Sequence, residues 1–553
     1  MMLQQRNKSG IARARMAKTF DFIIVGAGSA GCVLANRLSA DPQTSVLLIE
    51  AGPRDWNPVF RIPIMAGRLF LGSYCNWSYV TEPEPHLNGR RIPWPRGRVL
   101  GGSSAINGMI YTRGNAADYD GWAQLGLRAW SYERVLPYFK RSEARMSGAD
   151  EYHGADGLLP VGKLLSPNPV FEAFIEAGQQ AGLPYNDDFN GAAQEGVGRY
   201  DYNVRNGERW SAARSFLDPA RARSNLTVAT GAQLRRIILD KGRAVGVSIE
   251  HGQTEDYFAE REVILSCGAV GSPMALMHSG IGNADDLRKL GIEPVADLRA
   301  VGENLQDHLQ VVVAHRSLTP DETYDDCRAD RAAMRMLQAV VLKSGPFARM
   351  PHEGGAFLRS SESIEAPDLQ IHFIAGGLAR IRHPFARPAP QAPGRHDGYT
   401  LTGSICQLRP ESRGRITLAS ADTRAKPKIE ANYLSSDYDK RVMRTAVRMM
   451  REIFAQKAFD PHRGAELTPG SNVRTDAEID AYIAGAASTV FHPVGTCRMG
   501  IDEASVVDEE LRVRGVSGLR VVDASIMPRI VSSNTHAPTV MIAERAADFI
   551  LAA

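Results

Sequence analysis

The chain is 553 residues long, which exceeds what one hydrophobic core normally supports, so we expect two domains. Its 65 basic and 62 acidic side chains nearly cancel to a formal net charge of +3, and they are dispersed along the chain. This balance excludes strong steering toward nucleic acid. The six cysteines stand far apart and form no Cys-x-x-Cys pair or zinc-type spacing, so we expect no metal site and a reduced, cytoplasmic protein.

The first residues carry several basic side chains but lack the apolar run of a secretory signal. We expect residues 1–17 to form a disordered tail, and Met16 is a candidate for the natural start because the first strand pattern begins just after it. The longest uncharged stretch, residues 267–284, is interrupted by glycine, proline and histidine. We therefore expect no transmembrane helix, while peripheral association with a membrane stays open.

A dinucleotide-binding pattern opens the chain. Residues 20–25 form a short, mostly apolar run typical of a strand buried on both faces, and the pattern Gly-x-Gly-x-x-Gly follows at once. Gly26 permits a tight turn, Gly28 lets the backbone approach a pyrophosphate, and Gly31 lets the next helix, predicted over about residues 30–39, pack on the strand. The phosphates would lie at the N-terminus of that helix, beside Ser29 and Ala30.

A second apolar run, residues 46–49, ends in Glu50 and Ala51. Glu50 stands 19 residues beyond Gly31, where an acidic side chain accepts hydrogen bonds from the ribose hydroxyls of a dinucleotide. An acid at this position disfavours a 2′-phosphate. These features fit NAD and FAD equally, so other parts of the chain must decide between them.

Three further stretches bear on that choice. Residues 519–522 form an apolar strand pattern that ends in Asp523 and Ala524, which could bring a carboxylate to the ribityl or phosphate part of FAD. The alternative is a strand capped by a surface aspartate. Residues 97–107 are dense in glycine and small hydroxyl side chains, which suits either close backbone contact with a flat or anionic ligand or a flexible loop. Residues 263–269 form a strand that turns through Cys267 and glycine, and Pro273 is expected to start the next helix.

Two histidines stand 44 residues apart near the end of the chain, His492 within residues 491–500 and His536 within residues 533–539. Histidine has the side-chain pKa nearest neutrality, so a pair of them around a substrate hydroxyl could accept its proton and hold the resulting oxygen charge. Each could instead be a hydrogen-bonded core residue. Together with the dinucleotide pattern, the pair indicates a flavin enzyme that oxidises alcohols.

Several of these segments together resemble the glucose-methanol-choline (GMC) oxidoreductases, most closely the choline dehydrogenase-like and aliphatic alcohol dehydrogenase branch. The resemblance rests on residues 97–120, 268–282, 304–308, 491–500 and 534–539, and it runs in order from about residue 20 to the end. It implies an α/β (α+β overall) architecture with a Rossmann-like FAD-binding domain over residues 18–158, 205–310 and 485–553. A substrate domain with an antiparallel sheet and flanking helices would take residues 159–204 and 311–484.

The resemblance also implies roles for single residues. His492 would take the proton of a primary alcohol while hydride passes to flavin N5, and His536 would hydrogen-bond the alcohol oxygen. Ile106 stands where some relatives carry a histidine bonded to FAD, so we expect noncovalent FAD. The remaining residues expected along the cofactor are Arg98, Gly102, Asn107, Met109, Ile110, Leu234, Cys267, Pro538 and Thr539.

The region between the motifs predicts half-buried strands at residues 369–374 and 415–418 and a helix at residues 437–454. Candidates for the substrate pocket are Phe70, Leu71, Trp77, Glu353, Phe357 and Phe373. Glu353 is either a partner for a cationic substrate such as choline or a solvated loop carboxylate, and the latter is the favoured interpretation. Residues 376–399 are predicted to form a long irregular loop that covers the entrance, docks an electron acceptor or is plainly exposed, and plain exposure is the favoured interpretation.

Three functional classes stay open at this point. The leading one is an alcohol oxidoreductase that passes electrons to a quinone-like acceptor or to oxygen. The second is a non-redox flavoprotein of the same fold, of the hydroxynitrile lyase or fatty acid photodecarboxylase type. The third is a silent binding protein, which would be expected to lose the histidines while keeping the glycines, whereas this chain has both.

Overall fold

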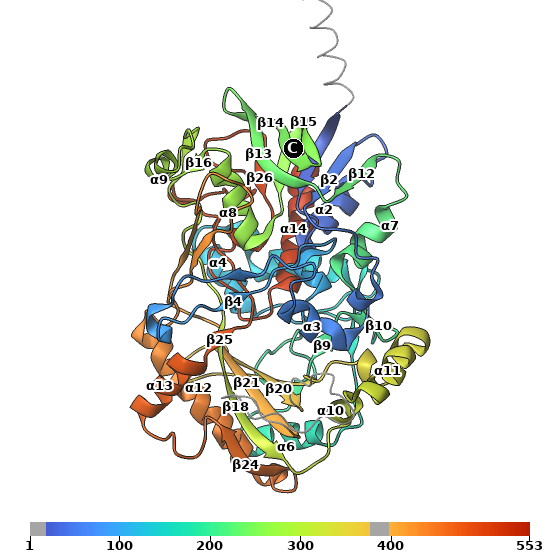
Figure 1. Cartoon of the computed structure of the whole chain (residues 1–553), viewed down its shortest axis with the longest axis vertical. Helices are drawn as coiled ribbons and strands as arrows, with labels where there is room; N and C mark the ends of the chain where they lie inside the picture. Colours follow the sequence, from blue (N-terminus) through green and yellow to red (C-terminus); the bar gives the residue numbers. More distant parts are fainter. Residues whose placement is uncertain (1–17, 377–397) are drawn as a thin grey trace, which may run out of the picture.

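The computed structural model describes residues 18–376 and 398–553. The predicted tail at residues 1–17 and nearly all of the predicted loop at residues 376–399 lie outside the described residues. Helices and strands form a mixed α/β fold in which one large sheet lies in the upper half of the molecule and a second lies in the lower half (Figure 1). This arrangement confirms the predicted fold class.

The upper sheet is built around the dinucleotide pattern. Its strands β12, β2, β1, β15 and β26 run parallel in that order, and β14 and β13 continue from β15 as antiparallel neighbours. Their bounds are Leu226–Thr230 (β12), Val46–Glu50 (β2), Thr19–Val25 (β1), Gln253–Leu265 (β15), Leu519–Val521 (β26), Arg243–His251 (β14) and Gln233–Asp240 (β13). The sheet thus joins strands from the beginning, the middle and the end of the chain.

Two helices pack against each other beside this sheet: α2 (Ser29–Leu38) and α14 (His536–Ala552). The helix predicted over residues 30–39 therefore begins and ends one residue earlier. Glu544 of α14 is fully buried and forms ion pairs with Arg37 of α2 at 2.7 Å and with Arg141 at 2.8 Å. Removing one partner of a buried ion pair leaves an uncompensated charge, so these contacts fix the position of the C-terminal helix.

Helix α8 (Gly268–His278) corrects the predicted helix start, because Pro273 lies inside it. A proline in a helix interior cannot donate a hydrogen bond to the carbonyl four residues earlier. Here that carbonyl belongs to Ala269, and the hydroxyl of Thr496 donates to it at 2.6 Å. A side chain from the segment of His492 thus replaces the missing helical donor, which the local sequence of α8 could not reveal.

The lower sheet is antiparallel, in the order β24, β18, β21, β20, β19, β8, with β25 also paired to β18. Helices α12 and α6 pack against one of its faces. The strand bounds are Arg463–Thr468 (β24), Leu309–Ser317 (β18), Thr400–Gln407 (β21), Leu369–Ala375 (β20), Gly354–Leu358 (β19), Gly196–Arg199 (β8) and Ser488–Thr489 (β25); the helices are Asp437–Ala455 (α12) and Val170–Gln180 (α6). The predicted strand at 369–374 and helix at 437–454 are confirmed, but β20 is almost completely buried and not half-buried as predicted.

The predicted strand at 415–418 is β22 (Arg415–Thr417), which pairs with β23 (Lys428–Glu430) in a separate two-stranded sheet. The other helices are α3 (Ala66–Leu71), α4 (Ala116–Gln124), α5 (Tyr132–Ser142), α7 (Asp218–Ala220), α9 (Ala284–Lys289), α10 (Glu322–Asp326), α11 (Ala329–Leu337) and α13 (Asp476–Ala486). The other strands are β3 (Tyr79–Val80), β4 (Pro93–Trp94), β5 (Ile110–Tyr111), β6 (Glu143–Arg145), β7 (Leu159–Lys163), β9 (Asp201–Tyr202), β10 (Val204–Arg205), β11 (Glu208–Arg209), β16 (Ile281–Gly282) and β17 (Ala296–Asp297).

The two largest hydrophobic clusters follow the two sheets. One joins residues of β1, β2, α2, β15 and α14, and the other joins residues of β18, β20, β21, α6 and α12. A separate apolar core is what defines a domain. We retain the division into a discontinuous FAD-binding domain and a substrate domain, with the boundaries given above, as a proposal that these clusters support.

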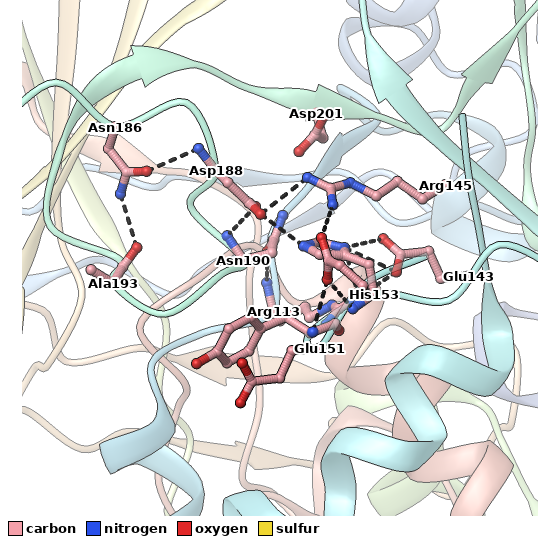
Figure 2. A network of polar contacts seen from close by, with 12 residues as sticks. Arg113, Glu143, Arg145, Glu151, His153, Asn186, Asp188, Asn190, Ala193 and Asp201 are labelled. Carbon is pink, nitrogen blue, oxygen red and sulfur yellow. Dashed lines mark hydrogen bonds and ion pairs between the residues drawn. The ribbon is translucent and has the colours of Figure 1, made fainter. Parts of the chain in front are cut away.

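A buried network of charges surrounds His153 (Figure 2). Its Nδ1 lies 3.0 Å from Glu143 and its Nε2 lies 2.9 Å from Asp188, while Arg113 pairs with Glu143 at 2.5 Å. Burial lowers the pKa of His153, but the hydrogen bonds to Asp188 and Glu143 outweigh it and raise the pKa above its ordinary value. Both ring nitrogens donate to carboxylates, so the charged imidazolium joins the segments of Glu143 and Asp188.

Asp150, His153 and Asp188 also lie close enough together to suggest a metal site. A histidine binds a metal ion only through a ring nitrogen that carries no proton. Both ring nitrogens of His153 carry a proton, and Arg145 forms ion pairs with Asp150 at 2.5 Å and with Asp188 at 3.1 Å. We therefore describe this cluster as an ion-pair network.

The contact between Gly31 and Gly26 gives the first prediction. A Cβ atom at Gly31 would lie 1.9 Å from the carbonyl oxygen of Gly26, so α2 cannot keep its position against β1. We expect Gly31→Ala to destabilise the fold by about 1–3 kcal/mol, as overpacking does, and to lower the flavin content of the purified protein. Thermal unfolding and the absorbance ratio of flavin to protein measure the two effects.

The matched control is Gly121→Ala in α4, where an added Cβ meets nothing within 4 Å. Alanine is favoured over glycine in helices by about 1 kcal/mol, so this variant should be as stable as the wild type or slightly more so. Equal loss in both variants would show that the Gly31 contact is not special.

Candidate active site

A cavity of about 2100 Å³ extends from the first turn of α2 to the lower sheet. Most residues predicted along the cofactor line it: Gly26, Gly28, Ser29, Ala30, Glu50, Ala51, Gly102, Asn107, Met109, Ile110, Leu234, Cys267, Asp523, Ala524 and Thr539. His492 and His536 line it as well. Gly31, Arg98 and Pro538 do not, and the guanidinium of Arg98 instead lies 4.9 Å from the ring centre of Trp77.

Glycines in the cavity wall let the backbone segments that form it pack closely together, where a side chain would collide with a neighbouring segment. A Cβ atom at Gly26 would lie 2.5 Å from the carbonyl oxygen of Ser266, and one at Gly102 would lie 2.7 Å from the Cα of Gly28. The first turns of α2 and α14 border the same space. Because a first helical turn leaves backbone N–H groups without intrahelical partners, this end of the cavity suits an anionic pyrophosphate and a flat ring.

Two buried carboxylates border this part of the cavity. Glu50 accepts hydrogen bonds from the backbone N–H groups of Ala27 at 3.0 Å and Gly52 at 2.8 Å, and burial raises its pKa to about 7. Asp523 accepts from Gly268 N at 2.9 Å and Ser272 Oγ at 2.6 Å, which ties it to the start of α8. Hydroxyl donors of a ribose or ribityl chain would supply hydrogen bonds that Glu50 and Asp523 can accept, so the donor set of the cavity fits FAD.

His492 is held by its backbone as well as its ring. The residue before it, Phe491, has a positive φ of 68°, and the backbone N–H of His492 donates to Asp307 at 2.7 Å. The carboxylate of Asp307 also accepts from Thr489 and Tyr433, both at 2.5 Å. This buried carboxylate therefore joins β25 to the His492 segment behind the ring.

The ring of His492 has one possible tautomer in this setting. Burial lowers the pKa of His308 to about 3, so that ring is neutral, and its Nε2 lies 3.0 Å from the carbonyl oxygen of Leu408. A carbonyl only accepts, so the proton of His308 is on Nε2 and its Nδ1 is an acceptor. Nδ1 of His492 lies 3.0 Å from that acceptor and must donate to it. Nε2 of His492 therefore carries no proton and is an acceptor.

The predicted partner of His492 is His536, but the side chain that lies opposite Nε2 of His492 is Asn534. The side-chain nitrogen of Asn534 lies 3.2 Å from Nε2 of His492. His536 begins α14, and its Nδ1 instead lies 2.9 Å from the hydroxyl of Ser29. A helix start turns side chains two residues apart in different directions, so His536 borders the cavity near the dinucleotide pattern while Asn534 faces the base.

The amide of Asn534 is oriented by two donors. Its oxygen accepts from Thr112 Oγ1 at 3.1 Å and from Gln370 Nε2 at 3.0 Å, so its NH₂ group points toward His492. Sequence reasoning missed Asn534 and His308. Both stand inside segments that carried the family resemblance, and this was the signal that could have found them.

Burial lowers the pKa of His492 well below 6.5, and the nearby His308, His372 and Arg96 lower it further. A neutral ring that keeps its lone pair at neutral pH can act as a base without first losing a proton. The arrangement can therefore accept a proton at Nε2 of His492 and donate a hydrogen bond from Asn534 to an oxygen at the same place.

The lower sheet forms the wall of the cavity beyond this pair. Side chains alternate along a strand, and the face opposite α12 presents Gln310, Val312 and Ala314 of β18, Thr402 and Ser404 of β21, and His372 and Ile374 of β20. Among the proposed pocket residues, Phe70, Leu71 and Trp77 line the cavity. Phe357 and Phe373 do not, because both are fully buried in hydrophobic clusters.

Glu353 also lies away from the cavity lining, and it is not the solvated loop carboxylate that we predicted. It is buried, its pKa is raised to about 7 by burial, and Arg199 pairs with it at 2.5 Å. Its place between strands depends on the pairing of β8 with β19, which local sequence does not show. Glu353 is thus a structural ion-pair partner.

Known proteins resemble this chain over nearly its whole length. Models of the family described as GMC oxidoreductase match residues 20–310 and 410–543. The chain is 45% identical to an oxygen-dependent choline dehydrogenase from Brucella canis over 96% of this chain and 95% of that protein. Among solved structures it is similar to pyridoxine 4-oxidase from Mesorbium loti (TM-score 0.85, 33% identity, 96% and 98% coverage) and to a formate oxidase variant from Aspergillus oryzae studied for FAD modification (0.87, 27%, 97% and 98%).

The chain belongs to the GMC oxidoreductase family. It is a flavoprotein oxidoreductase that acts on CH–OH donors with FAD, and nothing in the fold or the comparisons favours the non-redox alternative. Within residues 18–376 and 398–553, no helix has both the length and the apolar character needed to span a bilayer.

The low pKa of His492 predicts the pH dependence of the reaction. A base works in its unprotonated form, which predominates above its pKa, so a pKa well below 6.5 keeps the lone pair available throughout the neutral range. We expect kcat/KM for a non-ionising alcohol to be level between about pH 6.5 and 8 and to fall only at lower pH. An acid limb with its midpoint at or above 6.5 would contradict this assignment.

Proposed function

We propose that the protein oxidises a primary alcohol to the aldehyde at the place where His492 and Asn534 face each other. The observation that supports this most directly is the hydrogen-bond chain from Leu408 through His308 to His492, because it leaves Nε2 of His492 unprotonated beside the amide of Asn534, and both residues line the cavity. His536, the second histidine of the sequence, takes no part in this pair.

In the proposed mechanism, Nε2 of His492 accepts the hydroxyl proton of the substrate. The positive charge that forms on the imidazole is shared with His308 through the Nδ1 hydrogen bond. Asn534 donates its amide hydrogen to the alkoxide oxygen and holds the carbinol in one orientation. FAD, when bound, supplies the acceptor for the hydride that leaves the same carbon. Thr112 and Gln370 keep the Asn534 amide from rotating.

We propose that FAD is held without a covalent bond. It would be held by the glycines of the dinucleotide pattern, by Glu50 and by the start of α14. Their positions in the cavity lining support this. Ile106, at the position where some relatives attach the flavin through histidine, is a buried hydrocarbon side chain that lines the cavity. An isoleucine has no nucleophilic atom with which to form such a bond.

The electron acceptor that we propose is oxygen or a quinone-like compound. The similar proteins include an oxygen-dependent choline dehydrogenase and a pyridoxine 4-oxidase, which supports oxygen. We keep a cytoplasmic location, with or without peripheral membrane association, as part of the proposal.

Anaerobic reduction of the bound flavin by a panel of primary alcohols tests the function. We expect His492→Ala to lose about 10²–10⁴-fold in the rate of reduction, the usual contribution of a general base, while keeping its flavin. We expect Asn534→Ala to lose about 10²–10³-fold, as when a donor to a developing oxyanion is removed. Stopped-flow absorbance near 450 nm follows both.

His536→Ala is the matched comparison for Asn534→Ala. If Asn534 is the partner of His492, the His536 variant should retain a much larger part of the reductive rate at equal flavin content. The reverse order of the two variants would restore His536 as the oxygen-binding residue. Unchanged turnover in His492→Ala would refute the proposed base.

Acid precipitation tests the noncovalent binding. Denaturing the yellow protein breaks every noncovalent contact, so we expect the flavin absorbance in the supernatant and a colourless pellet. Colour that stays with the washed pellet would show a covalent bond. An Ile106→His variant precipitated in parallel tests whether a nucleophile at this position changes the outcome.

A further inference from the structure

The charges around the cavity indicate which class of alcohol it accepts. Among the described lining residues, the acidic side chains are Glu50 and Asp523, and the basic ones are Arg68, Arg90, Arg96, Arg235, Arg424 and Lys426. Both acids lie in the cofactor part, where backbone N–H groups hold them. The part around His492 and the lower sheet therefore offers no described carboxylate to a positively charged substrate.

The charges nearest to the base compensate each other. Arg96 donates to the carbonyl oxygen of Phe491 at 2.5 Å, and its positive charge acts on His492. The carboxylate of Asp307 offsets that charge from behind the His492 backbone, and it does not line the cavity. A cationic substrate would thus meet no excess of negative charge.

The sheet wall next to the base is polar and neutral. Gln310 is two residues beyond His308 on the same strand segment, so its side chain lies on the same face as the ring that supports the base. Ser404 donates to Oε1 of Gln310 at 2.5 Å. Ser404 lies opposite Val312 of β18 on one side and opposite His372 of β20 on the other, so all three are neighbours on this face. Burial lowers the pKa of His372 to about 3, so this side chain is uncharged as well.

Aromatic faces can bind a cation without a carboxylate, and the rings that line the cavity include Phe70, Trp77 and Phe491. Phe70 and Phe491 pack against each other with ring centres 5.7 Å apart, and Trp77 is also paired. The guanidinium of Arg98 lies 4.9 Å from its centre, and Tyr79 stacks with it at 5.9 Å. Moving a quaternary ammonium out of water without compensation is costly, whereas a neutral alcohol carries no such penalty.

We propose that the cavity takes an uncharged alcohol. The neutral wall of Gln310, His372 and Ser404 excludes choline, the quaternary ammonium alcohol on which similar enzymes act. This inference rests on the proposed function, since it concerns the substrate of the same site. Gln310 has the length of a glutamate without its charge, which makes it the residue that sets the preference. The hydroxyl and amide groups of the wall would hydrogen-bond a second polar group of the substrate.

The test uses the holoenzyme and two alcohols of almost equal shape, choline and 3,3-dimethylbutan-1-ol, in which carbon replaces the charged nitrogen. We expect the uncharged alcohol to reduce the flavin with at least about tenfold higher kcat/KM. Gln310→Glu should shift the ratio at least about tenfold toward choline, since a charge pair at contact distance is worth more than one factor of ten. Gln310→Leu is the neutral control and should keep the preference for the uncharged alcohol.

A wild type that oxidises choline as well as or better than the uncharged alcohol would overturn the inference and leave the proposed function intact. Ser404→Asp places the charge on the neighbouring side chain if Gln310→Glu does not retain flavin. If neither alcohol reduces the wild-type flavin, the binding of choline and of 3,3-dimethylbutan-1-ol to the His492→Ala holoenzyme is measured through the change in flavin absorbance. Tighter binding of the uncharged alcohol supports the inference there, and tighter binding of choline refutes it.

Discussion

The hydrogen bond between Nδ1 of His308 and Nδ1 of His492 is the constraint on which the proposed chemistry depends. Two neutral imidazoles form a hydrogen bond between their Nδ1 atoms only if one Nδ1 carries a proton and the other does not. The carbonyl of Leu408, just after β21, places the proton of His308 on Nε2. His308 in turn places the proton of His492 on Nδ1. A backbone atom of the lower sheet thereby sets the lone pair of a side chain that follows β25.

That relay explains why the site needs both sheets. His308 and Leu408 belong to strands of the lower sheet and their ends, Asn534 precedes the C-terminal helix, and the glycines of the cofactor cradle follow β1 of the upper sheet. The cavity between them is bordered by helix starts at one end and by a strand face at the other. Anionic and flat ligand groups suit the first end, and the alternation of side chains along strands gives the second a uniform wall.

The sequence predicted those parts of the structure that depend on neighbours along the chain. The fingerprint of β1 and α2, the acid after β2 and the helix at α12 follow from short spacings, and the structure has them within one residue. Sequence patterns did not predict features that depend on contacts between segments far apart in the chain. Pro273 could stand inside α8 because the hydroxyl of Thr496 donates to the carbonyl oxygen of Ala269, to which Pro273 itself cannot donate. Glu353 is buried because β8 pairs with β19. The choice between Asn534 and His536 depended on where α14 begins, and two residues of a single motif cannot be separated by spacing alone.

The late position of β26 and α14 in the chain has a consequence for biosynthesis. The strand beside β15 and the helix that packs on α2 both come from the last 35 residues, and the ion pairs of Glu544 need that helix in place. Domains fold as units while the ribosome adds about 5–20 residues per second, yet this nucleotide fold stays incomplete until residues 519–552 have been synthesised. A flavin held by the start of α14 must accordingly wait for these late residues, and a chain that stopped before residue 519 would lack both β26 and the partner of Arg37.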